Sequence, residues 1–132
     1  MRYLLDTDTC IYALKGMASV LASLLSRSRS DVAVSVITEA ELRTGAAKSS
    51  SPAKTLRLVE NFLRPLTILE FTTQDAIAYA QVRARLERAG TPIGPLDTLI
   101  ASQAVARQLT LVSNNEREFR RVSGLHLENW MR

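Results

Sequence analysis

Four acidic residues of this chain stand where a carboxylate is costly to bury. Asp6 ends an apolar segment near the N-terminus, and Glu118 lies shortly after another apolar segment. Asp97 is followed by apolar residues at the i+3, i+4, i+7 and i+8 positions, which places it on the apolar face of a predicted helix. Glu41 lies on a second predicted helix. A chain that buries unpaired carboxylates repeatedly is expected to supply a cation.

A bound divalent metal ion is the chemistry that these residues favour. Neither Asp6 nor Asp97 has a Lys or Arg beside it in the sequence. Mg²⁺ prefers oxygen ligands and keeps several water molecules, so two or three carboxylates meet its needs. Such an ion neutralises a phosphodiester and lowers the pKa of a bound water. We therefore predict a hydrolytic site with Asp6 and Asp97 as direct ligands. Glu41 and Glu118 would act through water, hold a second ion or orient the nucleophile.

Strands and helices are predicted to alternate along the whole chain. The expected strands are 2–6, 32–37, 66–71, 109–113 and a short one around 125–127, and the expected helices are 8–15, 18–29, one capped by Thr38, 53–64, 74–89, 97–108 and 116–121. The Thr38 to Glu41 spacing fits a capping box. No two strands are joined by a two-residue hairpin turn. The pattern therefore predicts a single α/β domain over residues 1–132, with a central parallel sheet in a three-layer α/β/α fold.

The predicted sheet brings the four acids toward one edge. Ligand sites in parallel α/β sheets lie at the carboxyl ends of the strands. Asp6 stands at such an end, Glu41 follows the second strand within two helical turns, and Glu118 follows another strand. Asp97 comes from a helix start that can face the same crevice. We expect the four carboxylates to converge there.

Each acid also has a purely structural interpretation. Asp6 could cap the first helix, and Asp97 could interact with the N-terminal end of its own helix. Glu41 could pair with Arg43 or Lys48, and Glu118 could be an exposed helix residue.

The composition is that of a globular domain with an aliphatic core. Hydrophobic residues make up 46% of the chain, aromatic residues only 5% and charged residues 23%. The net charge of +4 comes mostly from arginines, which favour a polyanionic partner, although it would equally serve solubility. Arginines 83, 85, 88, 117, 120 and 121 could follow an RNA backbone or form a solvated face.

Two further observations limit the chemistry of the site and the cellular location of the protein. Cys10 and His126 are the only residues of their kinds, which excludes an intrachain disulfide and a cysteine-based zinc site. No apolar run approaches the ~20 residues of a membrane span. The N-terminus reaches Asp6 too soon for a signal peptide, so we expect a cytoplasmic protein.

Four segments, in order, resemble the motifs of PIN-domain ribonucleases. They are Leu4–Tyr12, Glu41–Gly45, Gly94–Ala101 and Leu111–Phe119. More closely, the chain resembles the VapC toxins of bacterial VapBC toxin–antitoxin pairs, and this resemblance runs from residue 2 to the closing Leu127–Trp130.

The resemblance implies a Mg²⁺- or Mn²⁺-dependent endoribonuclease with the PIN fold. Asp6 and Asp97 would be the principal metal ligands, and Glu41 would be the acid of the family's Glu-Leu-x-x-Gly motif. Ser113 matches a small hydroxyl residue that orients the site. Asn115 stands where family members often carry Asp and offers no charge, which Glu118, at a more variable acidic position, would supply. We therefore expect one resident ion.

The resemblance also implies partners and a substrate. A VapB-type antitoxin would insert a segment into the acidic crevice, and an arginine reaching the carboxylates would block metal binding. The family tends to form homodimers and larger toxin–antitoxin assemblies, for which surplus apolar residues on the first helices could serve. Close relatives from enteric-type bacteria cut the anticodon loop of initiator tRNA, so we expect an RNA substrate, specifically tRNA, and inhibition of translation.

Three other functions compete with this interpretation. Asp6-Thr7-Asp8-Thr9 resembles the opening of haloacid-dehalogenase-like phosphatases, but Cys10 departs from that motif. A phosphoacceptor receiver domain shares an acidic Mg²⁺ pocket, yet it needs a lysine after the last strand, and the lysines are 15, 48 and 54. A catalytically silent interaction domain with the same fold is the third, and the neutral Asn115 favours it.

Overall fold

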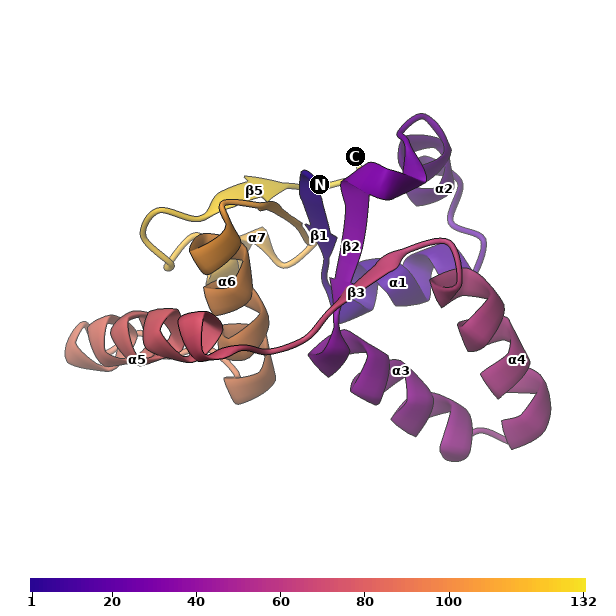
Figure 1. Ribbon diagram of the computed structural model, residues 1–132, viewed down its shortest axis with the longest axis horizontal. Helices are drawn as coiled ribbons and strands as arrows, with labels where there is room; N and C mark the ends of the chain where they lie inside the picture. Colours follow the sequence, from indigo (N-terminus) through magenta and orange to yellow (C-terminus); the bar gives the residue numbers. More distant parts are fainter.

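Five short segments rich in β-branched and aliphatic residues form the central sheet of this protein. The computed structural model describes residues 1–132, and all neighbouring strands in it are parallel. The strands are β1 (Tyr3–Leu5), β2 (Val32–Ser35), β3 (Thr67–Leu69), β4 (Thr110–Val112) and β5 (His126–Glu128). Their order is β3-β2-β1-β4-β5, so the first strand lies in the centre (Figure 1). The three inner strands, β2, β1 and β4, are almost completely buried, because helices cover both of their faces.

Helices connect the strands and cover both faces of the sheet (Figure 1). They are α1 (Thr7–Leu14), α2 (Ala18–Leu25), the 3₁₀ turn η1 (Arg29–Asp31), α3 (Val36–Ala47), α4 (Pro52–Leu63), α5 (Thr73–Arg88), α6 (Pro95–Arg107) and α7 (Glu116–Phe119). The predicted three-layer α/β/α fold is therefore confirmed. No single helix is long and apolar enough to span a membrane, and only α1 and α2 taken together, with a 102° bend between them, reach the necessary apolar length.

Two apolar cores lie on opposite sides of the sheet. Tyr3 and Leu5 belong to the core under α1 to α4, whereas Leu4 belongs to the core under α5 and α6. This separation follows from the strand geometry, because successive side chains of a strand point to opposite faces. Each face of β1 therefore packs against one of the two helical layers.

The start of α3 differs from the prediction. Val36 and Ile37 were expected to end a strand, but they form the first turn of α3, and the hydroxyl of Ser35 accepts the Ile37 N–H at 3.0 Å. Thr38 is completely buried inside the helix, so the predicted capping box from Thr38 is wrong. Ser35 ends the strand early because its hydroxyl satisfies one of the free amides of the helix.

The second predicted helix is also shorter than expected. It was predicted over 18–29, but α2 ends at Leu25. The guanidinium of Arg29 donates to the Leu24 carbonyl at 2.7 Å, and that of Arg27 donates to the Ser23 carbonyl at 2.8 Å. These side chains add hydrogen bonds to the last carbonyls of α2, which the Ser26 hydroxyl and the Arg27 N–H also reach.

A buried polar network joins α5 to α6. Asp75 is completely buried, and its Oδ2 accepts the Arg107 Nη2 at 3.0 Å and the Thr72 N–H at 2.9 Å. The Gln103 amide donates to the Glu70 carbonyl at 2.9 Å beside it. Burial alone would raise the pKa of Asp75, but the hydrogen bonds from Arg107 and Thr72 hold it below its usual value. Asp75 is an acid that the sequence analysis did not single out, and its role is structural.

The two chain termini lie side by side at one end of the sheet, away from the N-terminal ends of α3 and α6 (Figure 1). Trp130 packs edge-on against Tyr3, with ring centroids 5.5 Å apart. The guanidinium of Arg27 lies 4.6 Å from the Trp130 ring centroid and 4.9 Å from that of Tyr3. This cluster attaches the C-terminal segment to β1 and to the end of α2.

Candidate active site

Asp6 follows β1 directly and begins α1. Its Oδ1 accepts the Thr9 N–H at 2.8 Å, so the predicted N-cap role is real, and its own backbone N–H donates to the Val112 carbonyl at the end of β4. Only 3% of the residue is exposed. Burial raises the pKa of Asp6, and the hydroxyls of Ser113 and Thr9 oppose this shift only in part. The structure therefore holds Asp6 in one orientation at the carboxyl ends of the two central strands.

Asp97 lies in the first turn of α6, which begins two residues earlier at Pro95. The pKa of Asp97 is raised to about 6, first by burial and then by the negative charges of Asp6, Glu41, Glu118 and Asp8. These charges come from different elements of the fold, so the predicted acids share one electrostatic environment. No cation compensates this cluster, because none of its members forms a salt bridge.

Glu41 is fixed by a hydroxyl from another helix. Its Oε1 accepts the Thr7 hydroxyl at 2.6 Å, which joins α3 to the first residue of α1. Arg43 instead pairs with Glu39 at 3.0 Å and with Glu60 at 3.5 Å, so the alternative pairing of Glu41 with Arg43 is wrong. The positioning role of Thr7 was not predicted, although its place directly after Asp6 was a usable signal.

Ser113, Asn115 and Glu118 form a chain of hydrogen bonds after β4. The Ser113 hydroxyl accepts the Asn115 N–H at 2.9 Å, and the Asn115 Nδ2 donates to Glu118 Oε2 at 3.1 Å. Ser113 is completely buried, whereas Asn115 and Glu118 are partly exposed. Asn115 thus holds the carboxylate of Glu118, a task that a negatively charged Asp at this position could not perform by donation.

The donor set suits a hard divalent cation. As the side chains stand, no three acidic, histidine or cysteine residues form a ready-made metal cage. The cluster nevertheless offers only oxygen ligands, and burial together with its uncompensated charge raises the pKa of Asp97 to about 6. A bound divalent cation would relieve both the repulsion and the desolvation of these groups. Asp6 and Asp97, with Glu41 and Glu118 around them, are the residues that fit this ion.

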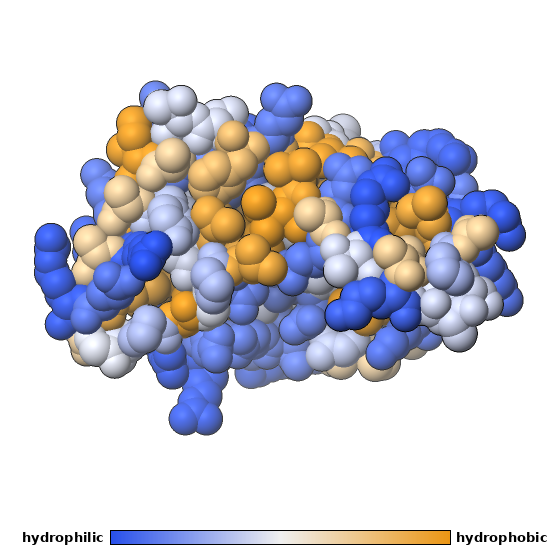
Figure 2. Space-filling view, turned by 90° about the horizontal axis from the view of Figure 1, so that it is seen from below, coloured by the Kyte–Doolittle hydropathy of each residue, from blue (hydrophilic) through white to orange (hydrophobic).

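The face that carries the N-terminal ends of α3 and α6 also has apolar character. Figure 2 views the molecule from this side and shows a broad apolar area at its centre with polar margins. Ile37, Ala40 and Leu96 line a shallow hollow together with Glu41 and Thr44. Leu96 is 44% exposed there, one residue before Asp97.

A parallel α/β fold with one buried and three partly buried acids at the carboxyl edge of its sheet is the arrangement of a known protein family. The model of the PIN domain matches residues 3–125, and the chain belongs to the PIN-domain family. It is 42% identical to the tRNA(fMet)-specific endonuclease VapC of Salmonella typhimurium over 130 residues, 98% of each chain. It is 40% identical to ribonuclease VapC2 of Haemophilus influenzae over 131 residues, 99% of each chain.

A solved structure agrees with these sequence matches. The crystal structure of VapBC2 from Rickettsia felis, bound to a DNA fragment from its promoter, contains a chain with a TM-score of 0.93 and 38% identity. The match covers 98% of the present chain and 99% of that chain. Within the PIN-domain family, the chain is thus one of the VapC proteins.

Proposed function

We propose that this protein is the toxin of a toxin–antitoxin pair and a Mg²⁺-dependent endoribonuclease. The observation that carries the proposal is the uncompensated cluster of Asp6, Glu41, Asp97 and Glu118, where burial and then the neighbouring charges raise the pKa of Asp97 to about 6. The full-length relatives named as ribonuclease and endonuclease support it. Hydrolysis of a phosphodiester needs charge neutralisation and an activated water, and an all-oxygen acidic site suits both.

Each residue of the cluster has a distinct task in this proposal. Asp6 and Asp97 would hold Mg²⁺, or Mn²⁺ in its place, which when bound neutralises phosphate charge and lowers the pKa of a water. Glu41, held by Thr7, and Glu118, held by Asn115, would orient the attacking water and accept its proton. Ser113 and the Thr9 N–H keep Asp6 in place. The tethers fix the carboxylates before substrate arrives, which reduces the reorganisation that the reaction requires.

The test is a cleavage assay on total RNA with Mg²⁺, Mn²⁺ or EDTA. Wild type should give discrete cuts with either metal and none in EDTA. Asp6→Asn and Asp97→Asn should each lower the cleavage rate by roughly two orders of magnitude or more. Glu60→Gln is the control, since this exposed acid pairs with Arg43 away from the cluster. Equal cleavage by wild type and the two Asn variants would overturn the proposal, as would a folded wild type without cleavage.

The proposed substrate is tRNA, with the anticodon loop of initiator tRNA as the first candidate. The Salmonella typhimurium relative is named as specific for tRNA(fMet). An open acidic crevice suits a single-stranded loop, since duplex RNA hides its base edges. Cleavage of that loop would stop translation. Purified initiator and elongator methionine tRNAs should be cut at very different rates, with the initiator preferred, and primer extension would locate the cut.

The proposed partners are a VapB-type antitoxin and a second copy of this chain, all in the cytoplasm. The acidic cluster would attract an arginine of the antitoxin, and the Rickettsia felis relative was solved as a VapBC complex. Met17 and Leu25 are 39% and 68% exposed near the first helices, and Leu96 is exposed beside the acidic cluster. These apolar residues favour a homodimer that the antitoxin joins in a larger assembly. Light scattering should give about twice the 14.6 kDa chain mass, and a species of 14.6 kDa alone would contradict the dimer.

A further inference from the structure

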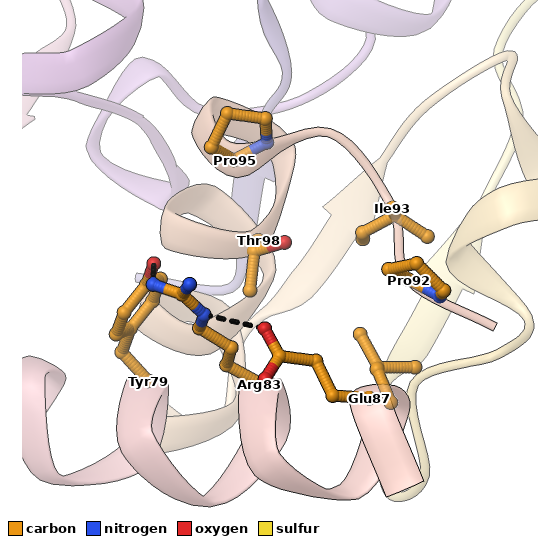
Figure 3. A pocket seen from close by; sticks show the side chains of 8 residues that line it. Tyr79, Arg83, Glu87, Pro92, Ile93, Pro95 and Thr98 are labelled. Carbon is orange, nitrogen blue, oxygen red and sulfur yellow. Dashed lines mark hydrogen bonds and ion pairs between the residues drawn. The ribbon is translucent and has the colours of Figure 1, made fainter. Parts of the chain in front are cut away.

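A second pocket lies next to the acidic cluster, around the first turn of α6 (Figure 3). Its volume is about 210 Å³, and one face of α5, the loop of residues 90–94 and α6 enclose it. The residues that define it are Tyr79, Arg83, Glu87, Pro92, Ile93 and Thr98. Thr98 directly follows Asp97, so the pocket and the acidic cluster adjoin the same first turn of α6, with the two side chains directed about 100° apart around the helix.

One wall of the pocket is polar and exposed. Arg83 Nε donates to Glu87 Oε2 at 2.8 Å, and Arg83 Nη1 donates to the Tyr79 hydroxyl at 3.1 Å (Figure 3). The Arg83 and Glu87 side chains are 58% and 55% exposed. An exposed ion pair of this kind contributes little to stability, so both side chains can exchange partners at small cost.

The other walls are apolar. Pro92 and Ile93 face the ion pair from across the pocket (Figure 3). Thr98 presents its methyl group, because its hydroxyl donates to the Gly94 carbonyl at 2.8 Å. Leu86 adds a buried apolar surface from α5. The pocket therefore offers apolar surfaces beside a carboxylate acceptor and a guanidinium donor.

The loop that closes the pocket is held in place. Arg121 donates to the Pro92 carbonyl at 3.0 Å, and the Thr91 N–H donates to the Leu86 carbonyl at 3.0 Å. Pro92 and Pro95 restrict the backbone further. A preformed pocket of this kind spares a ligand the entropy cost of ordering a loop.

Arginines without carboxylate partners line the hollows beside this pocket. Arg85, Arg88 and Arg121 form no salt bridge. Arg85 and Arg121 line a neighbouring hollow that shares Leu86 with the pocket. Guanidinium groups without carboxylate partners are suited to phosphates that flank whatever the pocket holds, and Arg121 can do so while it donates to the Pro92 carbonyl.

We propose that this pocket binds one unpaired nucleobase of the RNA substrate next to the scissile phosphate, and that Glu87 and Arg83 select guanine there. This inference rests on the proposed ribonuclease function. The two oxygens of Glu87 can accept the adjacent N1–H and N2–H groups of guanine, while Arg83 donates to O6. Pro92, Ile93 and Thr98 supply apolar walls around the base. Among the four bases, only guanine has one acceptor (O6) followed by two neighbouring donors (N1–H and N2–H) along its Watson–Crick edge.

The test uses single-stranded RNA oligonucleotides with one fixed cleavage site and each of the four bases in turn at the flanking positions. Wild type should cleave the guanine substrate faster at one of these positions. Glu87→Gln and Arg83→Gln should each reduce this preference roughly five- to tenfold, as expected for a partly exposed base contact. The matched controls are Glu39→Gln and Arg43→Gln, which remove an i,i+4 ion pair of similar geometry on α3 and should leave the preference unchanged.

A binding measurement separates failure of this inference from failure of the ribonuclease proposal. GMP should shift the NMR signals of the Ile93 and Thr98 methyl groups in EDTA, more than AMP, CMP or UMP do, and Glu87→Gln should abolish the difference. Cleavage that ignores the flanking base, with no methyl shifts, would overturn the pocket assignment and leave the ribonuclease intact. Pocket variants that weaken only antitoxin neutralisation would assign the pocket to the antitoxin instead, and would equally overturn it.

Discussion

At the residue scale, the main feature is a set of like charges that the fold brings together without a counterion. Such a cluster destabilises the metal-free protein, since a carboxylate is forced to remain close to others in a partly dehydrated site. The effect is seen at Asp97, whose pKa is raised from 3.8 to about 6 by burial and by the neighbouring carboxylates. The same repulsion makes the site receptive to a divalent cation, so instability without metal and affinity for metal have one cause.

The raised pKa of Asp97 predicts a pH-dependent difference between wild type and Asp97→Asn in EDTA. Below about pH 3.8 the Asp97 carboxyl is protonated in both the folded and the unfolded state, and the two proteins should be equally stable. As the pH rises to about 6, only the unfolded state loses its proton readily, so wild type loses stability relative to the variant. Above pH 6 the variant should be more stable by about 1–2 kcal/mol, allowing for partial solvent exposure.

Urea unfolding at several pH values measures this difference. Comparing the two proteins at each pH cancels the opposite trend from Asp75 and Glu116, whose pKa values are lowered and which lose their stabilising effect as the pH falls. Adding Mg²⁺ at pH 7.5 should reverse the order by stabilising wild type alone. A stability difference that stays constant from pH 4 to pH 7 would contradict the placement of Asp97 in the cluster.

Asp6 has two tasks that substitution can separate. Asn is also a good N-cap, so Asp6→Asn should keep the cap on α1, whereas Asp6→Ala should cost about 1 kcal/mol more through loss of the bond to the Thr9 N–H. Both variants should lose the stabilisation by Mg²⁺. Thermal unfolding with and without Mg²⁺ measures both effects, and a Mg²⁺ response retained by Asp6→Asn would remove Asp6 from the metal site.

At the element scale, the packing of α5 against α6 depends on a buried acid rather than on apolar contact alone. Asp75→Ala should destabilise the protein by about 2–4 kcal/mol, because it leaves the Thr72 N–H without its partner and removes the ion pair of Arg107, which keeps only its bond to the Glu70 carbonyl. Arg107→Met should cost similarly, and the double variant should cost much less than the sum, which chemical unfolding in a double-mutant cycle would show. Additive losses would mean that the two side chains do not act as a pair.

The element boundaries show what the sequence could and could not predict. The alternation of strands and helices was sufficient to predict the parallel sheet. The apolar segment before Asp6 was sufficient to predict that this acid lies at the end of a strand. Val36 and Ile37 were predicted to be strand because they are β-branched, but β propensity depends on context. Here the Ser35 cap begins α3 at Val36 instead. Asp75 was missed because its partner Arg107 lies 32 residues away in the sequence. The bond from Asn115 to Glu118 likewise depends on side-chain orientations that spacing does not determine.

At the scale of the whole molecule, the C-terminal segment closes the fold against its first strand. Trp130 is 4% exposed in the core formed by Tyr3 and Leu5 with α1 to α4. Trp130→Ala should destabilise the protein by about 3–5 kcal/mol through the cavity it leaves and the lost contact with Arg27. Circular dichroism in urea measures this loss. Leu58→Ala is the control, since Leu58 is 53% exposed, and an equal effect of the two changes would contradict the closing role of Trp130.

The strand order also fixes when the site can first exist. The central strand β1 is synthesised first, yet its neighbour β4 ends at Val112, and Glu118 follows still later. A nascent chain that has reached Arg107 already contains Asp6, Glu41 and Asp97, but it lacks the strand that sets Ser113 and Glu118 beside them. The four carboxylates therefore meet only after β4 and α7 have been synthesised, and a fragment that ends before β4 carries three of the acids without the site. The topology thus sets an order in time, since the activity proposed here can begin only after Glu118 has been added to the growing chain.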